Sequence, residues 1–219
     1  MKKFAFVSDF DGTLTTKDFY HIIIENYLKE DGKKFYKEWK KENKINVEFL
    51  NKIFGSIDIK ESDLQNDIIN IPIDKNAKEL IELVNINKGD FYVVSAGTSY
   101  YINILFEYLD IKDVKVISME GKYEGKNLKI TPNKNSKFFS EIFGIDKGKI
   151  LREIKEQYEY VFFAGDSEPD LEAAKVADTT FAKKELKELL EKEKAEFVAF
   201  DTFAEIINYM NEKGWFNEV

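Results

Sequence analysis

The sequence predicts an α/β fold, in which a Rossmann-like parallel sheet carries helices on both faces and a small all-helical cap is inserted after the first strand. Three short apolar runs, 4–7, 91–94 and 160–164, each end in polar or glycine residues, as buried parallel strands do. Segments with helical spacing alternate with these runs, which favours strands joined by crossover helices. Between the first two runs, over about residues 19–64, the pattern is helical only.

The insert is expected to contain several helices and to end before the second strand. Its helical segments are 21–27, 35–42 and 47–54. Asp31–Gly32 and Gly55–Ser56 lie between these segments, and both pairs are plausible helix stops. Pro72 ends the insert.

The rest of the chain supplies the remaining strands and the helices that cover the sheet. Further strands are expected at residues 113–118, 179–182 and 197–200, and helices at 75–85, 100–109, 146–157, 171–176, 183–194 and 202–213. Residues 120–130 contain two glycines and are expected to form a hairpin or an irregular excursion. The chain therefore divides into a catalytic core, residues 1–14 and 73–219, and a helical cap, residues 15–72.

Composition excludes several classes of function. The 219 residues carry 33 Lys and Arg against 41 Asp and Glu, a net charge of −8, which argues against a nucleic-acid groove. The chain has no cysteine and a single histidine, His21, so disulfides, a cysteine nucleophile and multi-histidine zinc sites are excluded. No apolar stretch is long enough to span a membrane, and Asp9 interrupts the apolar start too early for a signal peptide. We expect a cytoplasmic protein, either a monomer or a homodimer.

Two carboxylates follow the first predicted strand, at the edge of the sheet where ligands bind in such folds. The segment reads Asp9-Phe10-Asp11-Gly12-Thr13. Residues two apart in an extended chain point to the same side, so Asp9 and Asp11 can reach one pocket, and Gly12 permits a sharp turn. Close carboxylates repel unless a cation lies between them or one holds a proton. The pair therefore suits Mg²⁺ or an acid beside a nucleophile, with a solvated or calcium-binding turn as the plainer alternative.

Other polar residues follow strands or begin helices at the same edge. A hydroxyl and free N–H groups at Ser95 and Gly97 suit a phosphate, although Ser95 could instead cap the next helix. Asp166 follows the third apolar run, and Asp170, one turn later, can brace it or cap a helix. Lys147 begins a helix, where its charge opposes the macrodipole unless it faces an anion; a surface lysine is the simpler interpretation. Together these groups fit phosphoryl transfer, which needs a nucleophile, a metal and a fixed cation.

These residues resemble the motifs of the haloacid dehalogenase superfamily of phosphohydrolases. The segment from Phe6 to Thr13 looks like its first motif, and Ser95, Lys147 and residues 165–170 follow in the order of its second, third and fourth motifs. The resemblance covers essentially the whole chain, and the insert is similar to the cap of the phosphoserine phosphatase-like branch. Lys147 fits that branch because it directly precedes the glycine at the apolar start of its helix; Lys149 remains the alternative.

The resemblance implies the chemistry of the carboxylates. Asp9 would attack phosphorus and become an aspartyl phosphate, while Asp11 would protonate the leaving oxygen and later take a proton from the hydrolytic water. Mg²⁺ would be held by the Asp9 carboxylate, the Asp11 carbonyl oxygen and Asp166, with Asp170 in support.

The resemblance also implies how the phosphate is held. Ser95 and the backbone of Gly97 would bind its oxygens, and Lys147 would neutralise charge on the phosphate and on Asp9. Closure of the cap could control the access of water.

The substrate is expected to be a small phosphorylated metabolite. Phosphoserine phosphatases place an acid nine positions after the nucleophile, where this chain has Asp18, but they also use a cap arginine, and the only arginine here is Arg152. Lysine could replace it only as a point charge. A closer likeness, in residues 15–23, 47–56, 165–182 and 189–206, is to the methionine-salvage phosphatases that act on 2-hydroxy-3-keto-5-methylthiopentenyl 1-phosphate. Phosphatases that act on phosphoethanolamine or pyridoxal phosphate are similar enough to remain alternatives.

Two other classes of function share part of this residue set. A phosphomutase of the same superfamily would also form the aspartyl phosphate, and release of inorganic phosphate separates the two activities. A non-enzymatic phospho-receiver domain also combines acidic residues, a hydroxyl and a lysine, but it carries its acceptor Asp in mid-domain and lacks a cap. The position of Asp9 on the first strand argues against a receiver.

Overall fold

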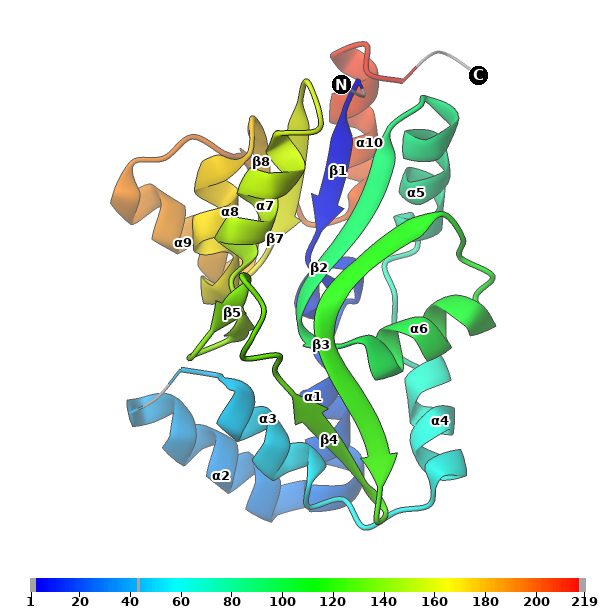
Figure 1. Cartoon of the computed structure of the whole chain (residues 1–219), viewed down its shortest axis with the longest axis vertical. Coiled ribbons are helices and arrows are strands. Elements are labelled where there is room, and N and C mark those ends of the chain that lie inside the picture. Colours follow the sequence, from blue (N-terminus) through cyan, green and yellow to red (C-terminus); the bar gives the residue numbers. More distant parts are fainter. Residues whose placement is uncertain (1–2, 43, 217–219) are drawn as a thin grey trace.

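The core of the protein is a seven-stranded sheet, shown in Figure 1 by a computed structural model that describes residues 3–42 and 44–216. Its strands lie in the order β4 (Asn127–Thr131), β3 (Val114–Glu124), β2 (Asp90–Thr98), β1 (Ala5–Ser8), β7 (Val161–Gly165), β8 (Thr179–Ala182) and β9 (Val198–Ala199). Neighbouring strands are parallel except in the antiparallel hairpin β3–β4. A separate ribbon, absent from the sequence prediction, pairs β5 (Phe139–Ser140) with β6 (Gly144–Ile145).

Helices cover both faces of the sheet and confirm the predicted fold class. On one face lie α7 (Lys147–Lys155) and α8 (Leu171–Val176), and on the other lie α5 (Ala77–Ile86) and α10 (Phe203–Glu212) (Figure 1). The other core helices are α6 (Ser99–Tyr108), α9 (Lys184–Glu193) and the short turn η3 (Glu168–Asp170). Within the described part of the chain, no helix has the length and apolar character needed to cross a bilayer.

The insert leaves and re-enters the core through one narrow neck. After β1 the chain makes a tight turn, η1 (Phe10–Leu14), and Thr15 then forms a β-bridge with Ile73. Between these two residues lie α1 (Phe19–Ile23), η2 (Ile24–Leu28), α2 (Lys29–Glu42), α3 (Val47–Phe54) and α4 (Glu61–Ile69). The two connections run side by side, so the insert hangs directly beyond the carboxyl end of β1 (Figure 1).

The predicted helix stop at Asp31–Gly32 is wrong, because α2 runs through both residues. The break falls instead at Lys29, whose φ of 50° interrupts the hydrogen-bonding pattern. Gly32 serves a close packing contact, since a Cβ placed on it would lie 2.5 Å from the Cβ of Leu28. The glycine therefore marks a crowded helix face and not a helix end. The stop predicted at Gly55 is confirmed.

A hairpin from the core packs against the insert. Strand β3 continues well past the edge of the parallel sheet and turns into β4, as expected for residues 120–130. The side-chain amide of Asn51, in α3, both donates to the carbonyl of Ile130 (3.0 Å) and accepts from its N–H (2.9 Å). The hydroxyl of Tyr123 donates to the carbonyl of Ile59 at 2.6 Å. These contacts tie the insert to the core at a second place besides its neck.

Four phenylalanines, one from each of β2, β1, β7 and β8, pack against one another, and we call them the phenylalanine row. The ring of Phe6 lies 5.3 Å from that of Phe91, 6.2 Å from that of Phe162 and 6.1 Å from that of Phe181, and the last two lie 6.2 Å from each other. All four rings are fully buried and nearly parallel. Offset aromatic pairs add about 0.5–1.5 kcal/mol each beyond the burial of their area. The row therefore packs these four strands together on the parallel sheet whose carboxyl ends carry the polar residues.

Replacing a ring in the middle of this row should strongly destabilise the protein. We expect Phe162→Ala to lower the free energy of unfolding by about 3–5 kcal/mol, because it leaves a cavity among the five rings that surround it. These are the rings of Phe4, Phe6, Tyr160, Phe181 and Trp215. Ile86→Ala is the control, since Ile86 is 69% exposed and should change stability by less than about 0.5 kcal/mol. Urea unfolding followed by circular dichroism measures both, and similar losses in the two variants would contradict the role given to the row.

Candidate active site

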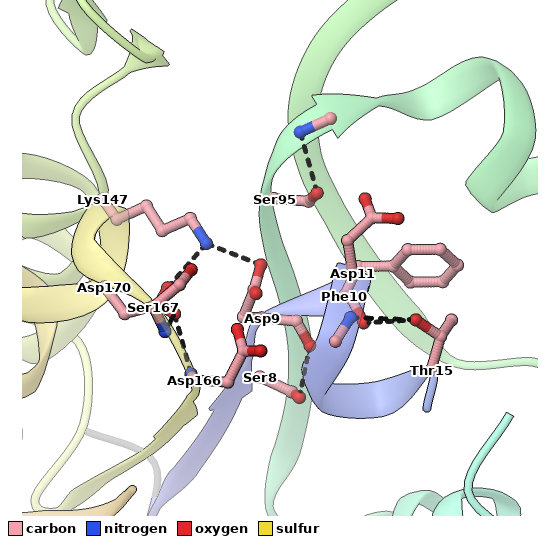
Figure 2. A network of polar contacts seen from close by, with 12 residues as sticks. Ser8, Asp9, Phe10, Asp11, Thr15, Ser95, Lys147, Asp166, Ser167 and Asp170 are labelled. Carbon is pink, nitrogen blue, oxygen red and sulfur yellow. Dashed lines mark hydrogen bonds and ion pairs between the residues drawn. The ribbon is translucent and has the colours of Figure 1, made fainter. Parts of the chain in front are cut away.

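Polar side chains from three strand ends and one helix start meet at the carboxyl edge of the sheet. Asp9 follows β1, Ser95 lies near the end of β2, Asp166 follows β7, and Lys147 begins α7. Figure 2 shows Lys147 reaching from its helix toward the carboxylate of Asp9. Because Ser8 pairs in register with both Val93 and Ala164, the ends of these strands lie next to one another.

Lys147 is buried between two carboxylates. Its ammonium donates to Asp9 Oδ1 at 2.6 Å and to Asp170 Oδ1 at 2.7 Å. The three residues are 3%, 4% and 0% exposed. Lys149, the alternative, is exposed and pairs with Asp146, whose side chain also caps the helix. The structure therefore brings Lys147, and not Lys149, to the carboxylates.

The carboxylates around Lys147 carry more negative charge than this one ammonium can neutralise. Burial raises the pKa of Asp9 well above its usual range, and Asp170 adds to the rise, which Lys147 only partly offsets. Burial also opposes the charge of Lys147, but attraction to Asp170 and Asp9 prevails and raises the pKa of its ammonium. Burial, followed by Asp170, raises the pKa of Asp166 to about 6. These shifts reflect carboxylates that repel one another in a site with little water.

Three of these carboxylates are close enough to share a cation. Among the described residues, oxygens of Asp9, Asp166 and Asp170 lie within 4.8 Å of one another, and all three residues are buried. Asp170 is already engaged, since its Oδ2 accepts from the N–H groups of Asp166 (2.9 Å) and Ser167 (3.1 Å). It therefore belongs to the capping box of η3 and holds the backbone of Asp166, whereas α8, the helix that Leu171 begins, has no side-chain cap at Asp170. The donor set of hard carboxylate oxygens fits a divalent cation such as Mg²⁺.

Asp11 lies in the tight turn after β1 and faces the same cavity as Asp9. Gly12, with a φ of 79°, allows this turn. The Oδ1 atom of Asp11 accepts from the N–H of Phe19 at 2.9 Å, and its Oδ2 accepts from the hydroxyl of Tyr101 at 2.5 Å. Burial, together with the charge of Asp18, raises the pKa of Asp11 to about 7.

Ser95 and Gly97 lie in the cavity but not at a helix N-terminus. Strand β2 continues to Thr98, and the side chain of Thr98, not that of Ser95, caps α6. The helix expected over residues 100–109 is confirmed, since α6 begins at Ser99, but the alternative that Ser95 caps this helix is wrong. The hydroxyl of Ser95, which is 1% exposed, accepts from the N–H of Gly97 at 3.0 Å. Both residues line the cavity with Asp9 and Asp11.

The cavity has a volume of about 570 Å³ and lies between the core and the insert. From the insert it is lined by Asp18, Tyr20, His21, Tyr36, Leu50 and Phe54, among others. Asp18 begins α1, and its charge acts on both Asp11 and Asp166. The structure thus places the predicted site residues around one cavity, except Asp170, which does not line it but contacts Lys147.

Two residues of the site were missed in the sequence. The ammonium of Lys184 donates to the carbonyl of Gly12 and to Asp166 Oδ2, both at 2.8 Å. A signal for Lys184 existed, because it follows strand β8 at the same edge, but its charged helix looked like a solvated surface. Tyr101 lies within α6 and reaches Asp11 from there, and nothing in the sequence pattern separates it from the other apolar positions of that helix.

Comparison with known proteins fits this geometry. The family model described as haloacid dehalogenase-like hydrolase matches residues 6–175. Proteins named 2-hydroxy-3-keto-5-methylthiopentenyl-1-phosphate phosphatase are 26% identical over 204 residues in Bacillus cereus (90% of this chain and 91% of the relative) and over 206 residues in Bacillus cytotoxicus (91% and 92%).

Solved structures share the fold. A phosphoserine phosphatase captured as an analogue of its phospho-aspartyl intermediate superposes with a TM-score of 0.69 at 22% identity, covering 95% of this chain and 99% of that one. The phosphoserine phosphatase from T. onnurineus superposes with a TM-score of 0.68 at 18% identity, with 96% and 94% covered.

The fold is that of an α/β enzyme, with a helical insert beside the cavity at the carboxyl edge of its sheet. The chain belongs to the haloacid dehalogenase-like hydrolases, as its first motif indicated. The relatives that match nine-tenths of its length are phosphoric monoester hydrolases by name. These findings confirm the predicted enzyme class.

Removing the buried ammonium should destabilise the core. We expect Lys147→Met, in metal-free buffer at neutral pH, to lower the free energy of unfolding by about 3–5 kcal/mol, because the carboxylates of Asp9 and Asp170 lose the charge that compensates them. Lys149→Met is the matched control from the same turn of α7. Loss of its exposed ion pair with Asp146 should lower the free energy of unfolding by less than about 1 kcal/mol. Equal losses in the two variants, measured by urea unfolding, would contradict this assignment.

Proposed function

We propose that the protein is a Mg²⁺-dependent phosphomonoesterase that acts on a small phosphorylated metabolite through an aspartyl phosphate on Asp9. The observation that carries this proposal is the contact of Asp9 with the buried ammonium of Lys147 at the end of the first strand, beside two further buried carboxylates. A carboxylate held in this way can approach phosphorus without rotating, while the lysine offsets the charge of the incoming phosphate.

In the first step, a carboxylate oxygen of Asp9 forms a bond to phosphorus as the bond from phosphorus to the ester oxygen breaks. The departing oxygen takes a proton from the carboxylic acid of Asp11, which becomes a carboxylate. Lys147 stays protonated throughout and faces the nucleophile. We assign the hydroxyl of Ser95 and the backbone of Gly97 to the phosphate oxygens; the N–H of Gly97, which here donates to Ser95 Oγ, would turn to the phosphate when it binds.

In the second step, water attacks phosphorus and the bond between phosphorus and the Asp9 oxygen breaks. The carboxylate of Asp11 takes a proton from this water, which restores its acid form. Inorganic phosphate leaves, and Asp9 returns to its carboxylate. The insert covers the cavity, and we propose that residues 15–72 act as a cap that limits other water in the site.

The chain's own carboxylates suit a magnesium ion. We assign it to the carboxylates of Asp9 and Asp166 and the carbonyl oxygen of Asp11, with Asp170 in support, because these are hard oxygen donors and the buried acids carry excess negative charge. A bound Mg²⁺ would draw charge from a phosphoryl oxygen and so favour attack by an anionic nucleophile.

The substrate that we favour resembles the methionine-salvage enol phosphate in the names of the matching relatives. A methylthio-alkyl chain needs an apolar pocket, and Tyr20, Leu50 and Phe54 of the insert line the cavity. Phosphoserine is the second candidate, because Asp18 lies in the cavity and could meet its ammonium group. No arginine lies in the insert to bind its carboxylate, which favours the first candidate.

A phosphate-release screen over small phosphomonoesters tests the proposal. The panel contains the enol phosphate, phosphoserine, phosphoethanolamine and pyridoxal phosphate, each with Mg²⁺ and with a chelator. We expect release that stops on chelation and returns when Mg²⁺ is added, with the enol phosphate giving the highest kcat/KM. Absence of release from every phosphomonoester would refute the proposed activity.

Asp9→Asn should abolish turnover and leave the fold intact. The amide cannot attack phosphorus, and its size matches the carboxylate, so we expect a loss of more than about a thousandfold in kcat. Asp110→Asn, at an exposed position, is the control and should retain full activity. Circular dichroism verifies folding. Retained activity in a folded Asp9→Asn protein would show that Asp9 is not the nucleophile.

Lys184→Met should tighten the binding of Mg²⁺. The ammonium contacts one of the assigned ligands, and removal of a neighbouring cation at a partly exposed position should be worth about 1 kcal/mol, or about fivefold in affinity. Lys192→Met, on the exposed face of the same helix, controls for the overall change in charge. Isothermal titration with MgCl₂ measures both variants, and unchanged or weaker binding in Lys184→Met would contradict this effect.

A further inference from the structure

Tyr101 is a buried tyrosine whose hydroxyl points into the site. It is 2% exposed and lies in α6, while its hydroxyl donates to Asp11 Oδ2 at 2.5 Å. Burial and the adjacent Asp11 raise the pKa of Tyr101, so the phenol keeps its proton. A buried hydroxyl usually has a partner, and here the partner is the carboxyl group that we assign to proton transfer.

The ring of Tyr101 is fixed from several sides. Its centroid lies 5.7 Å from that of Phe10, 5.0 Å from that of Phe19 and 6.4 Å from that of Phe54. The backbone makes room for the hydroxyl, since a Cβ on Gly97 would lie 1.7 Å from it. Residues from the core and from the insert therefore hold this hydroxyl at one point.

Both oxygens of Asp11 are held, and by different parts of the molecule. The core supplies Tyr101 through α6, and the insert supplies the N–H of Phe19, the first residue of α1. The carboxyl group cannot rotate without losing one of these bonds. The hydroxyl of Tyr101 donates to Oδ2, and a carboxylic acid still has lone pairs that accept hydrogen bonds. This bond can therefore persist in both protonation states of Asp11, while the proton of the acid stays available for the leaving oxygen.

We propose that Tyr101 is a positioning residue that orients Asp11 for proton transfer in both steps of the reaction. This inference rests on the proposed function of Asp11 as acid and base. The proton delivered to the leaving oxygen comes from Asp11 and is replaced by the proton of the attacking water, while the phenolic proton of Tyr101 is not consumed. Removing the hydroxyl therefore leaves the Asp11 carboxyl group less well oriented, while all the reacting groups remain.

The dependence on the leaving group tests this proposal. p-Nitrophenolate departs with little help from an acid, whereas an alkoxide needs the proton. Tyr101→Phe should lower kcat/KM for the best alkyl phosphate of the screen by about tenfold or more, and that for p-nitrophenyl phosphate by less than about threefold. Tyr108→Phe, an exposed tyrosine of the same helix, should change neither.

Two further measurements keep the outcomes distinct. Tyr101→Phe retains the ring, and its melting temperature reports whether the packing survives. In an Asp11→Asn background Tyr101→Phe should have no further effect on the alkyl phosphate, because the group that it orients is gone. Equal losses on both substrates, no loss on either, or the same loss in the Asp11→Asn background would overturn the proposal. A wild-type protein that hydrolyses none of the phosphomonoesters would instead refute the proposed function itself.

Discussion

The repulsion among buried carboxylates at the end of β1 is the constraint on which the rest of the site depends. Asp9, Asp166 and Asp170 place oxygens within 4.8 Å of one another, and isolated buried charges of one sign are strongly unfavourable. Lys147 offsets part of this charge. The remaining negative charge favours a divalent cation, so under our proposal the arrangement that destabilises the fold locally also supplies the affinity for Mg²⁺.

The sheet makes this arrangement possible by holding the strand ends rigidly. The phenylalanine row across β2, β1, β7 and β8 precedes the polar residues along these strands. Its buried rings stabilise the strands whose ends carry the charged groups. The row buries apolar area that offsets the cost of grouping like charges, and it keeps Asp9 and Asp166 on adjacent strands. The insert lies beyond the strand ends and is joined to the core at two places. One is the neck, where Thr15 lies, and the other is the hairpin that bonds to Asn51.

Much of this was visible in the sequence, because parallel strands bring their polar ends to one edge regardless of distance along the chain. The apolar runs located Asp9, Ser95 and Asp166, and the structure places them together. Features set by tertiary packing were not visible. Gly32 looked like a helix stop but serves a close contact, and Tyr101 looked like any apolar helix position. Its partner, Asp11, lies ninety residues away in sequence, and local pattern carries no information about such a contact.

We propose that the carboxylate of Asp9 forms the bond to phosphorus, and one measurement tests this directly. The enzyme is mixed with phosphomonoester and Mg²⁺, quenched in acid within milliseconds, digested and examined by mass spectrometry. The account predicts a phosphoryl group on the peptide that contains residues 4–17, located at Asp9 and absent when substrate is omitted. Phosphate release by a wild-type enzyme that leaves Asp9 unmodified at every quench time would contradict it.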